Sequence, residues 1–103
     1  AWHLHFQQED VWFVPPTSKL LVGLWDVRAE SATKGATMRL VLGDGKAQLL
    51  YIPRGVGHGA ANITACRQTL IYFVNNQFDA AQPDEHRLDA FALGREFWQI
   101  SVG

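Results

Sequence analysis

The stretch "YIPRGVGHGAAN", residues 51–62, sets a proline, a glycine, a histidine and an asparagine at fixed offsets directly after an apolar run. Pro53 and Gly55 favour a tight turn. Such a turn would return the chain so that His58 faces the interior of the fold. His58 is then a metal ligand, a residue that handles a bound small molecule, or a buried structural histidine. The rest of the chain must decide among these three roles.

The composition narrows the class of protein. The 103 residues predict one domain, residues 1–103, and nine basic against ten acidic side chains leave a formal charge of −1. Because neither sign is clustered, we expect neither nucleic acid nor an anionic membrane as a partner. The longest apolar run, Leu20 to Trp25, is far shorter than the roughly 20 residues that span a bilayer. No signal peptide is predicted either. Short chains bury a small share of their surface, so we expect a homodimer.

Three further residues indicate the compartment and the core. Cys66 is the only cysteine, which excludes an intrachain disulfide and fits a reducing compartment, so we expect a cytoplasmic protein. The strand-like sequence around Cys66 predicts a small buried side chain. Trp12 and Trp25 each lie within an apolar run and are predicted to form a core pair.

Short apolar runs separated by clusters of Gly, Pro, Asn, Asp or Ser recur about every ten residues, as in all-β sandwiches and barrels. The expected strands cover residues 2–6, 10–15, 19–28, 36–42, 47–53, 57–63, 68–75 and 95–101. About eight antiparallel strands with little or no helix predict a jelly-roll β-barrel or sandwich. The long polar segment 75–93 is expected to form a lid or rim, with one short helical turn in 84–93.

Candidate site residues begin near the N-terminus, in "WHLHFQQED". His3 and His5 stand at i and i+2, and in a strand this spacing directs both rings to the same face. Glu9 and Asp10 follow within five residues. Three imidazoles, counting His58, and one carboxylate are a suitable donor set for Mn, Fe, Ni, Cu or Zn.

These two stretches resemble the paired motifs of the cupin superfamily. The first motif is His-x-His followed three or four residues later by a carboxylate, and the second is Pro-x-Gly-x-x-His followed by Asn. The matching residues are His3, His5, Glu9 or Asp10, and Pro53, Gly55, His58 and Asn62. The resemblance implies a jelly roll with a central pocket, and a metal site as one alternative.

A second resemblance covers most of the chain. The blocks "LHFQ", "WDVRAESATKG", "LLYIPRGVGHG" and "LIYFVNNQFD" are similar, in order and nearly in spacing, to the dTDP-4-dehydrorhamnose 3,5-epimerase family, which acts without a metal on nucleotide-linked keto sugars. The resemblance implies that His5 is the general base and that Tyr72 returns a proton from the other face of the sugar. It also places His58 inside the pocket, Arg28 against the substrate and Asp89 nearest to the base as its acidic partner. His3 is expected at the pocket edge.

The chain also departs from the family pattern. Val11 stands where the family has the lysine that stabilises the enolate, and Lys19 is not an obvious replacement. Phe78 replaces a tyrosine of the sugar pocket, and the chain is shorter than the family's usual length. Without this lysine, the electrostatic stabilisation of the enolate would be lost, so we do not expect full epimerase activity. A related sugar isomerase, a nucleotide-sugar binder and an inactive descendant remain as alternatives.

The sequence therefore leaves three classes of function open. The first is a sugar-modifying enzyme that needs no cofactor and uses His5 and Tyr72. The second is a metal-binding cupin whose ligands come from His3, His5, Glu9, Asp10 and His58. The third is a cupin that binds a carbohydrate-type ligand without catalysis. A contact between Asp89 and His5 would favour proton transfer, whereas convergence of the histidines on a carboxylate would favour a metal.

Overall fold

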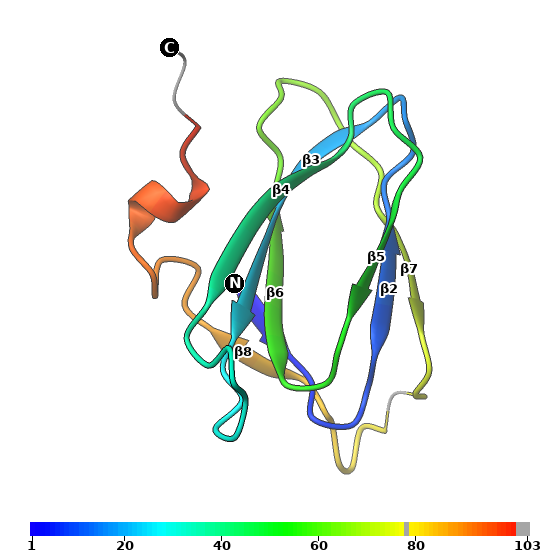
Figure 1. Ribbon diagram of the computed structural model, residues 1–103. Coiled ribbons are helices and arrows are strands. Elements are labelled where there is room, and N and C mark those ends of the chain that lie inside the picture. The colour runs from blue at the N-terminus through cyan, green and yellow to red at the C-terminus, as the bar shows by residue number, and fades with distance from the viewer. Residues whose placement is uncertain (78, 101–103) are drawn as a thin grey trace.

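Two antiparallel sheets face each other in the computed structural model, which describes residues 1–77 and 79–100 (Figure 1). The larger sheet has the strand order β4-β3-β6-β1-β8, and the smaller one has the order β5-β2-β7. The elements are β1 (Trp2–Leu4), β2 (Asp10–Phe13), β3 (Lys19–Asp26), β4 (Thr37–Gly43), β5 (Leu49–Ile52), β6 (Val56–Ala61), β7 (Ile71–Val74), β8 (His86–Leu88) and a 3₁₀ turn, η1 (Arg95–Trp98). The prediction of a nearly all-β jelly roll is confirmed.

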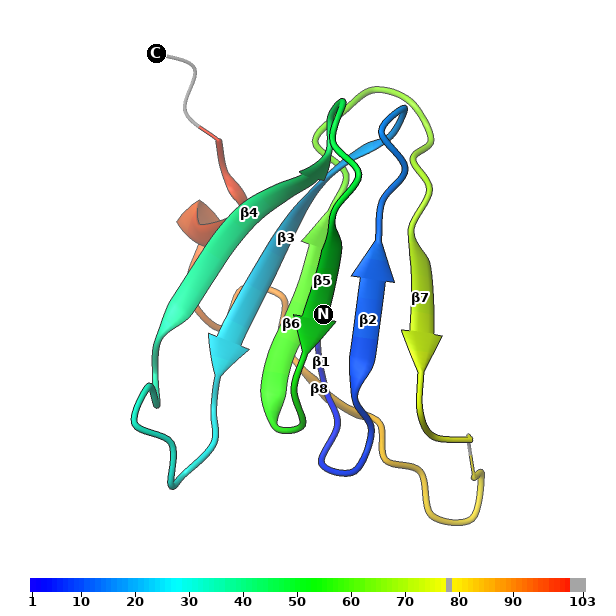
Figure 2. The same ribbon diagram turned by 45° about the vertical axis from the view of Figure 1, so that its right-hand side comes forward.

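The expected strands up to residue 75 are all present, most of them shorter than predicted. The expected strand 95–101 is wrong, because Arg95–Trp98 form η1, and residues 101–103 lie outside the described part of the chain, as does Phe78. The segment 75–93 contains β8 in addition to the expected irregular chain. Figure 2 shows its first part running past the lower end of the sandwich from β7 towards β8.

Aromatic packing explains why the C-terminal residues form a turn. Phe97 and Trp98 both contact Trp2 on the outer face of the larger sheet, with ring centroids 5.1 Å apart in each pair. Consecutive residues of a strand would point to opposite faces, so a strand could not place both rings there. Gly23 leaves room for this layer, and Figure 1 shows η1 on the outer side of the larger sheet.

The main core lies between the sheets. Its buried members are Trp12, Val14, Leu20, Val22, Leu42, Ile52 and Val56. Burying a side chain of this kind stabilises the fold by about 1.5–3 kcal/mol. The predicted pairing of Trp12 with Trp25 is wrong, because Trp25 packs edge-on against Trp2 in the outer aromatic layer instead. Cys66 is exposed, which contradicts the predicted burial: it follows a surface turn rather than entering a strand.

None of the helical segments in the described part of the chain has the length and apolar character needed to cross a membrane.

Candidate functional site

A cavity of about 430 Å³ opens between the two sheets. Its lining residues are Ala1, His3, His5, Gln8, Asp10, Trp12, His58, Ala60, Leu70, Tyr72 and Glu85. We call this cavity the central pocket. It brings together four residues that the sequence singled out for substrate chemistry, His3, His5, His58 and Tyr72.

Strand register places the histidines. His3 in β1 lies directly opposite His58 in β6, and their rings stack with centroids 6.1 Å apart. His5 follows two residues after His3 and faces the same way, with its ring 5.2 Å from that of His58. The turn before β6 is stabilised by Gly55, which has φ of 78° and donates its N–H to the His5 carbonyl at 2.7 Å. Two motifs more than 50 residues apart in sequence therefore meet in one pocket.

Each of the three histidines has its Nδ1 atom held by an acceptor. His5 Nδ1 lies 2.8 Å from the Asp84 carbonyl oxygen, and His58 Nδ1 lies 3.1 Å from the Val56 carbonyl oxygen. His3 Nδ1 lies 2.5 Å from a carboxylate oxygen of Glu85. A carbonyl oxygen only accepts, so the ring nitrogen facing it must carry the proton. In the neutral rings, the other nitrogen, Nε2, is then left with its lone pair.

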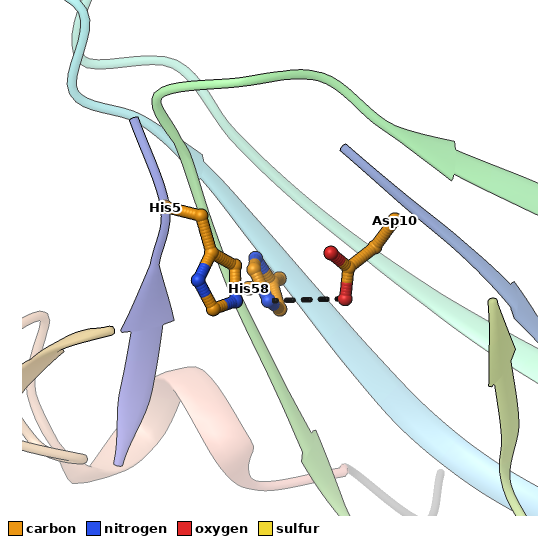
Figure 3. A group of neighbouring side chains, drawn as sticks. All are labelled: His5, Asp10 and His58. Carbon is orange, nitrogen blue, oxygen red and sulfur yellow. Dashed lines mark ion pairs between the residues drawn. The ribbon is translucent and has the colours of Figure 1, made fainter. Parts of the chain in front are cut away.

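Asp10 faces the histidines from β2 in the opposite sheet (Figure 3). One of its oxygens accepts a bond from the Gln8 amide at 2.8 Å, and the other lies 3.3 Å from Trp12 Nε1. The latter oxygen is 3.9 Å from His58 Nε2. His58 is 2% exposed, and this burial lowers its pKa despite the opposing effects of the Val56 carbonyl and the Asp10 carboxylate. At pH 7 the His58 ring is therefore neutral.

Ligand atoms of His5, Asp10 and His58 all lie within 4.8 Å of one another, and all three residues are buried. Figure 3 shows the two rings and the carboxylate pointing toward one another from β6, the end of β1 and the start of β2. This group is a part of the predicted metal set. His3 lines the pocket beside it, bonded to Glu85.

Glu9, another predicted metal ligand, points away from the pocket. Its carboxylate accepts a hydrogen bond from the Tyr51 hydroxyl and forms an ion pair with Arg54 at 3.2 Å. The carboxylate of Asp10, the first residue of β2, faces the pocket instead, because successive residues of an extended chain point to opposite faces. The alternative of Glu9 or Asp10 is thus resolved in favour of Asp10.

Arg28 lies outside the residues that line the central pocket. Its guanidinium binds Asp26 through Nε and one terminal nitrogen, both at 2.9 Å. This contact raises the pKa of Arg28 and holds that of the Asp26 carboxyl well below its usual range, with help from Ser31 and Thr33. Arg28, which the resemblance placed against the substrate, thus forms an ion pair that shapes a loop and does not line the central pocket.

The predicted contact between Asp89 and His5 is not formed. The Asp89 carboxylate accepts the backbone N–H of Phe91 at 2.7 Å and so closes a local turn. The acidic neighbours of the β1 histidines are Asp84 and Glu85, which sequence reasoning missed. No local signal marks them, since they lie about 80 residues from His3 and His5 and contact them only through folding.

Val11, which stands at the family's lysine position in an ungapped alignment, also faces away from the pocket. Its neighbours Asp10 and Trp12 line the pocket, and Val11 pairs with Tyr51 and Phe73 on the outer side of the smaller sheet. In this register, a lysine at position 11 would project outward as well. Within the described residues, the lining of the central pocket holds neither lysine nor arginine.

Two facing antiparallel sheets with histidines directed between them define a cupin-type jelly roll. The family profile for dTDP-4-dehydrorhamnose 3,5-epimerase matches residues 4–102, and the chain belongs to that family.

Two curated relatives support the assignment. The spore coat polysaccharide biosynthesis protein SpsL of Bacillus subtilis is 41% identical over 88 residues, which cover 85% of this chain and 58% of SpsL. The probable low-salt glycan biosynthesis epimerase Agl13 of Haloferax volcanii is 34% identical over 88 residues, or 85% of this chain and 56% of Agl13. The chain thus matches little more than half the length of each relative.

Solved structures agree on the fold. A dTDP sugar isomerase from Desulfovibrio desulfuricans superimposes with a TM-score of 0.77 at 26% identity, over 98% of this chain and 61% of that one. The capsular polysaccharide assembling protein CapF from Staphylococcus aureus gives a TM-score of 0.70 at 22% identity, over 85% of this chain and 24% of CapF. The CapF similarity supports the fold alone.

Proposed function

We propose that the central pocket binds a nucleotide-linked keto sugar and catalyses proton transfer at a carbon next to its carbonyl group. The observation that carries this proposal is that His5 and Tyr72 line one cavity from opposite sheets. A flat enolate held between them would have a base on one face and a proton donor on the other. Exchange of a proton between the two faces inverts the configuration at carbon, which is what an epimerase does.

In the first step, His5 Nε2 removes the proton from the carbon, the electron pair of the broken C–H bond forms the C=C bond of the enolate, and the C=O π pair moves to the carbonyl oxygen. The bond from Nδ1 to the Asp84 carbonyl keeps the Nε2 lone pair available for this step. In the second step, the Tyr72 hydroxyl gives its proton to the opposite face of the carbon, and the carbonyl is restored. Tyr72 is 64% exposed, so its phenolate can recover a proton from water, and the cycle closes when His5 releases to water the proton that it took.

The test is hydrogen–deuterium exchange with solvent: a dTDP-linked 4-keto-6-deoxy sugar is incubated with the protein in D₂O, and NMR monitors the sugar. We expect deuterium to enter the sugar beside the carbonyl, and His5→Gln to slow this entry by about 10²–10⁴-fold. Tyr72→Phe should retain exchange at carbon but lose inversion. Tyr51→Phe is the matched control, because Tyr51 is on the outer face and its hydroxyl binds Glu9. Exchange in His5→Gln at the wild-type rate would exclude His5 as the base, and binding without exchange would leave a carbohydrate-binding cupin.

The cluster of His5, Asp10 and His58 favours a second candidate function, a divalent transition metal site. Two buried imidazoles and a carboxylate suit Mn, Fe, Ni, Cu or Zn, and Nδ1 bonds to carbonyl groups are a common support for metal-binding histidines. The ligands would be Nε2 of His5 and His58 and a carboxylate oxygen of Asp10. A bound ion would polarise a carbonyl oxygen of the ligand.

Elemental analysis by plasma mass spectrometry, before and after chelation, tests this candidate. A metal site predicts near one equivalent of a transition metal, lost on His58→Asn and on Asp10→Asn. His86→Gln is the control, because His86 is exposed and outside the cluster. A protein that neither contains nor takes up a transition metal after incubation with each ion in turn would remove the candidate.

We also infer that a second copy of the chain covers the outer face of the smaller sheet. Its side chains form two rows of three across β5, β2 and β7: Leu49, Phe13 and Ile71 in one row, and Tyr51, Val11 and Phe73 in the other. Leu49 is 71% exposed and Phe73 is 60% exposed. A contiguous apolar face of this kind on a short chain supports sheet-to-sheet pairing, and two-fold pairing is the commonest form of self-association.

A cytoplasmic location is part of the proposal and is supported by the lone exposed cysteine.

A further inference from the structure

The side chain of Asp84 ties the connection between β7 and β8 to the loop between β1 and β2. The Asp84 carboxylate accepts the backbone N–H groups of Phe6, Gln7 and Gln8 at 2.8–2.9 Å. Burial acts to raise the pKa of Asp84, but these three bonds outweigh it and hold the pKa below its usual value. The carboxylate therefore stays ionised and serves as one fixed anchor for three consecutive residues that directly follow His5.

Asp84 and the next residue, Glu85, also hold the side chains of His3 and His5. The Asp84 carbonyl accepts His5 Nδ1 at 2.8 Å, while one oxygen of Glu85 accepts His3 Nδ1 at 2.5 Å. The second Glu85 oxygen lies 3.5 Å from His5 Nδ1. Asp84 and Glu85 thus bind the Nδ1 atoms of both His3 and His5.

These contacts decide which nitrogen of each ring carries the proton. Both acceptors, a carbonyl and a carboxylate, lack a proton to donate, so His3 and His5 must donate from Nδ1. In the neutral rings, their Nε2 atoms then carry the lone pairs. An alternative tautomer would place an N–H where a base or a ligand atom is needed and would leave the acceptors unpaired.

We propose that Asp84 and Glu85 are positioning residues, which dock the β7–β8 connection onto β1 and thereby fix the tautomer and orientation of His3 and His5. The proposal rests on the proposed function only in taking the central pocket as the working site. It adds that the pocket is completed by a docked segment rather than by the two sheets alone. Neither residue touches a reacting atom, and both act through the histidines.

The test is long-range ¹H–¹⁵N NMR of histidine-labelled protein with a chelator present, at about pH 8, above the ordinary histidine pKa. Wild-type His3, His5 and His58 should show protonated Nδ1 and bare Nε2. Asp84→Ala should move His3 and His5 toward the Nε2–H tautomer and leave His58 unchanged, since Val56 holds His58. Asp79→Ala is the control, because among the described residues the Asp79 carboxylate accepts a local N–H, that of Ala81.

A milder pair of variants covers the case in which Asp84→Ala does not fold. Glu85→Ala should release His3 while the Asp84 carbonyl keeps His5, and Glu85→Gln should restore His3, because an amide oxygen still accepts. Where the exchange reaction is observed, a folded Asp84→Ala variant should slow it by roughly 10–100-fold, because undocking the segment releases the His5 base. Asp84→Ala or Glu85→Ala with wild-type ring signals, or wild-type His5 protonated at Nε2, would overturn the proposal. The ring signals need no substrate, so absence of catalysis would refute the proposed function while leaving this inference standing.

Discussion

At the residue scale, the role of each charged side chain depends on the partner that it binds in the folded chain. The sequence block "WDVRAESATKG" suggested Arg28 for substrate binding, yet Asp26 takes up its guanidinium. Asp26 also accepts the hydroxyl groups of Ser31 and Thr33, so its buried carboxylate is fully bonded. The block therefore specifies the loop between β3 and β4 in this protein.

A prediction about acid stability follows from Asp26. Its pKa in the folded chain is well below the ordinary value of 3.8, first because of Arg28 and then because of Ser31 and Thr33. The folded state thus binds fewer protons than the unfolded state, so this contribution to stability is present above about pH 4 and is lost as the pH falls further. Asp26→Asn should have a lower Tm at pH 6 and a smaller loss of Tm between pH 5 and pH 3. Thermal melts beside Glu30→Gln, an exposed acid of the same loop, measure this, and parallel pH profiles for Asp26→Asn and wild type would contradict it.

At the scale of elements, the larger sheet is covered on both faces. Its inner face packs on the smaller sheet, and η1 with its flanking residues covers part of its outer face (Figure 1). Arg39 on β4 donates to the carbonyl groups of Phe97 and Gln99, and Trp98 Nε1 donates to the Ala90 carbonyl at 2.7 Å. The C-terminal segment is therefore bonded to β4 and to the turn that follows β8.

Gly23 tests this layer. A Cβ atom at position 23 would lie 2.6 Å from Phe97 and 2.9 Å from Trp2 and Trp98, closer than side-chain atoms approach. Gly23→Ala should therefore destabilise the protein by about 1–3 kcal/mol, the usual cost of overpacking. Urea unfolding measures the change. Gly35→Ala is unsuitable as a control because of its positive φ, so Ala60→Gly, at an exposed position on the neighbouring strand, serves instead. If Gly23→Ala keeps the wild-type stability, the aromatic side chains can shift to accommodate a methyl group, and the prediction is contradicted.

At the scale of the whole molecule, the two sheets differ in how their outer faces are covered. The larger sheet has its aromatic layer, whereas the outer face of the smaller sheet carries six apolar side chains in two rows, four of them exposed and two half-buried. Burying that face against a second copy would give both sheets two packed sides. The central pocket opens between the sheets and would remain accessible in such a pair.

Light scattering after gel filtration tests the assembly. The wild-type chain should have twice the mass of one copy at micromolar concentration, and Phe73→Arg should have the mass of a single copy, because a charge would be buried without a partner. Met38→Arg is the matched control, as Met38 is a similarly exposed apolar residue on β4 of the other sheet. A monomeric wild-type protein would exclude the second copy as the occupant of this face.

The sequence by itself determined the strands up to residue 75 and the direction of the histidines. The alternation of side chains along a strand is a local rule, so His3 and His5 on one face and His58 after a tight turn were predictable, and the structure places all three at one pocket. The cupin class and its epimerase family were also readable, because their motifs are short and contiguous.

Only the tertiary structure decided which acids meet the histidines. Asp89 was the expected partner, but Asp84 and Glu85 reach His5 and His3, and Asp10 rather than Glu9 faces His58. Such contacts depend on how the β7–β8 connection docks and on strand register, which no local pattern specifies. The same holds for η1, whose shape is set by packing against Trp2 and Gly23, more than 70 residues away. Local rules fix the direction of a side chain, and only the folded chain fixes its neighbours.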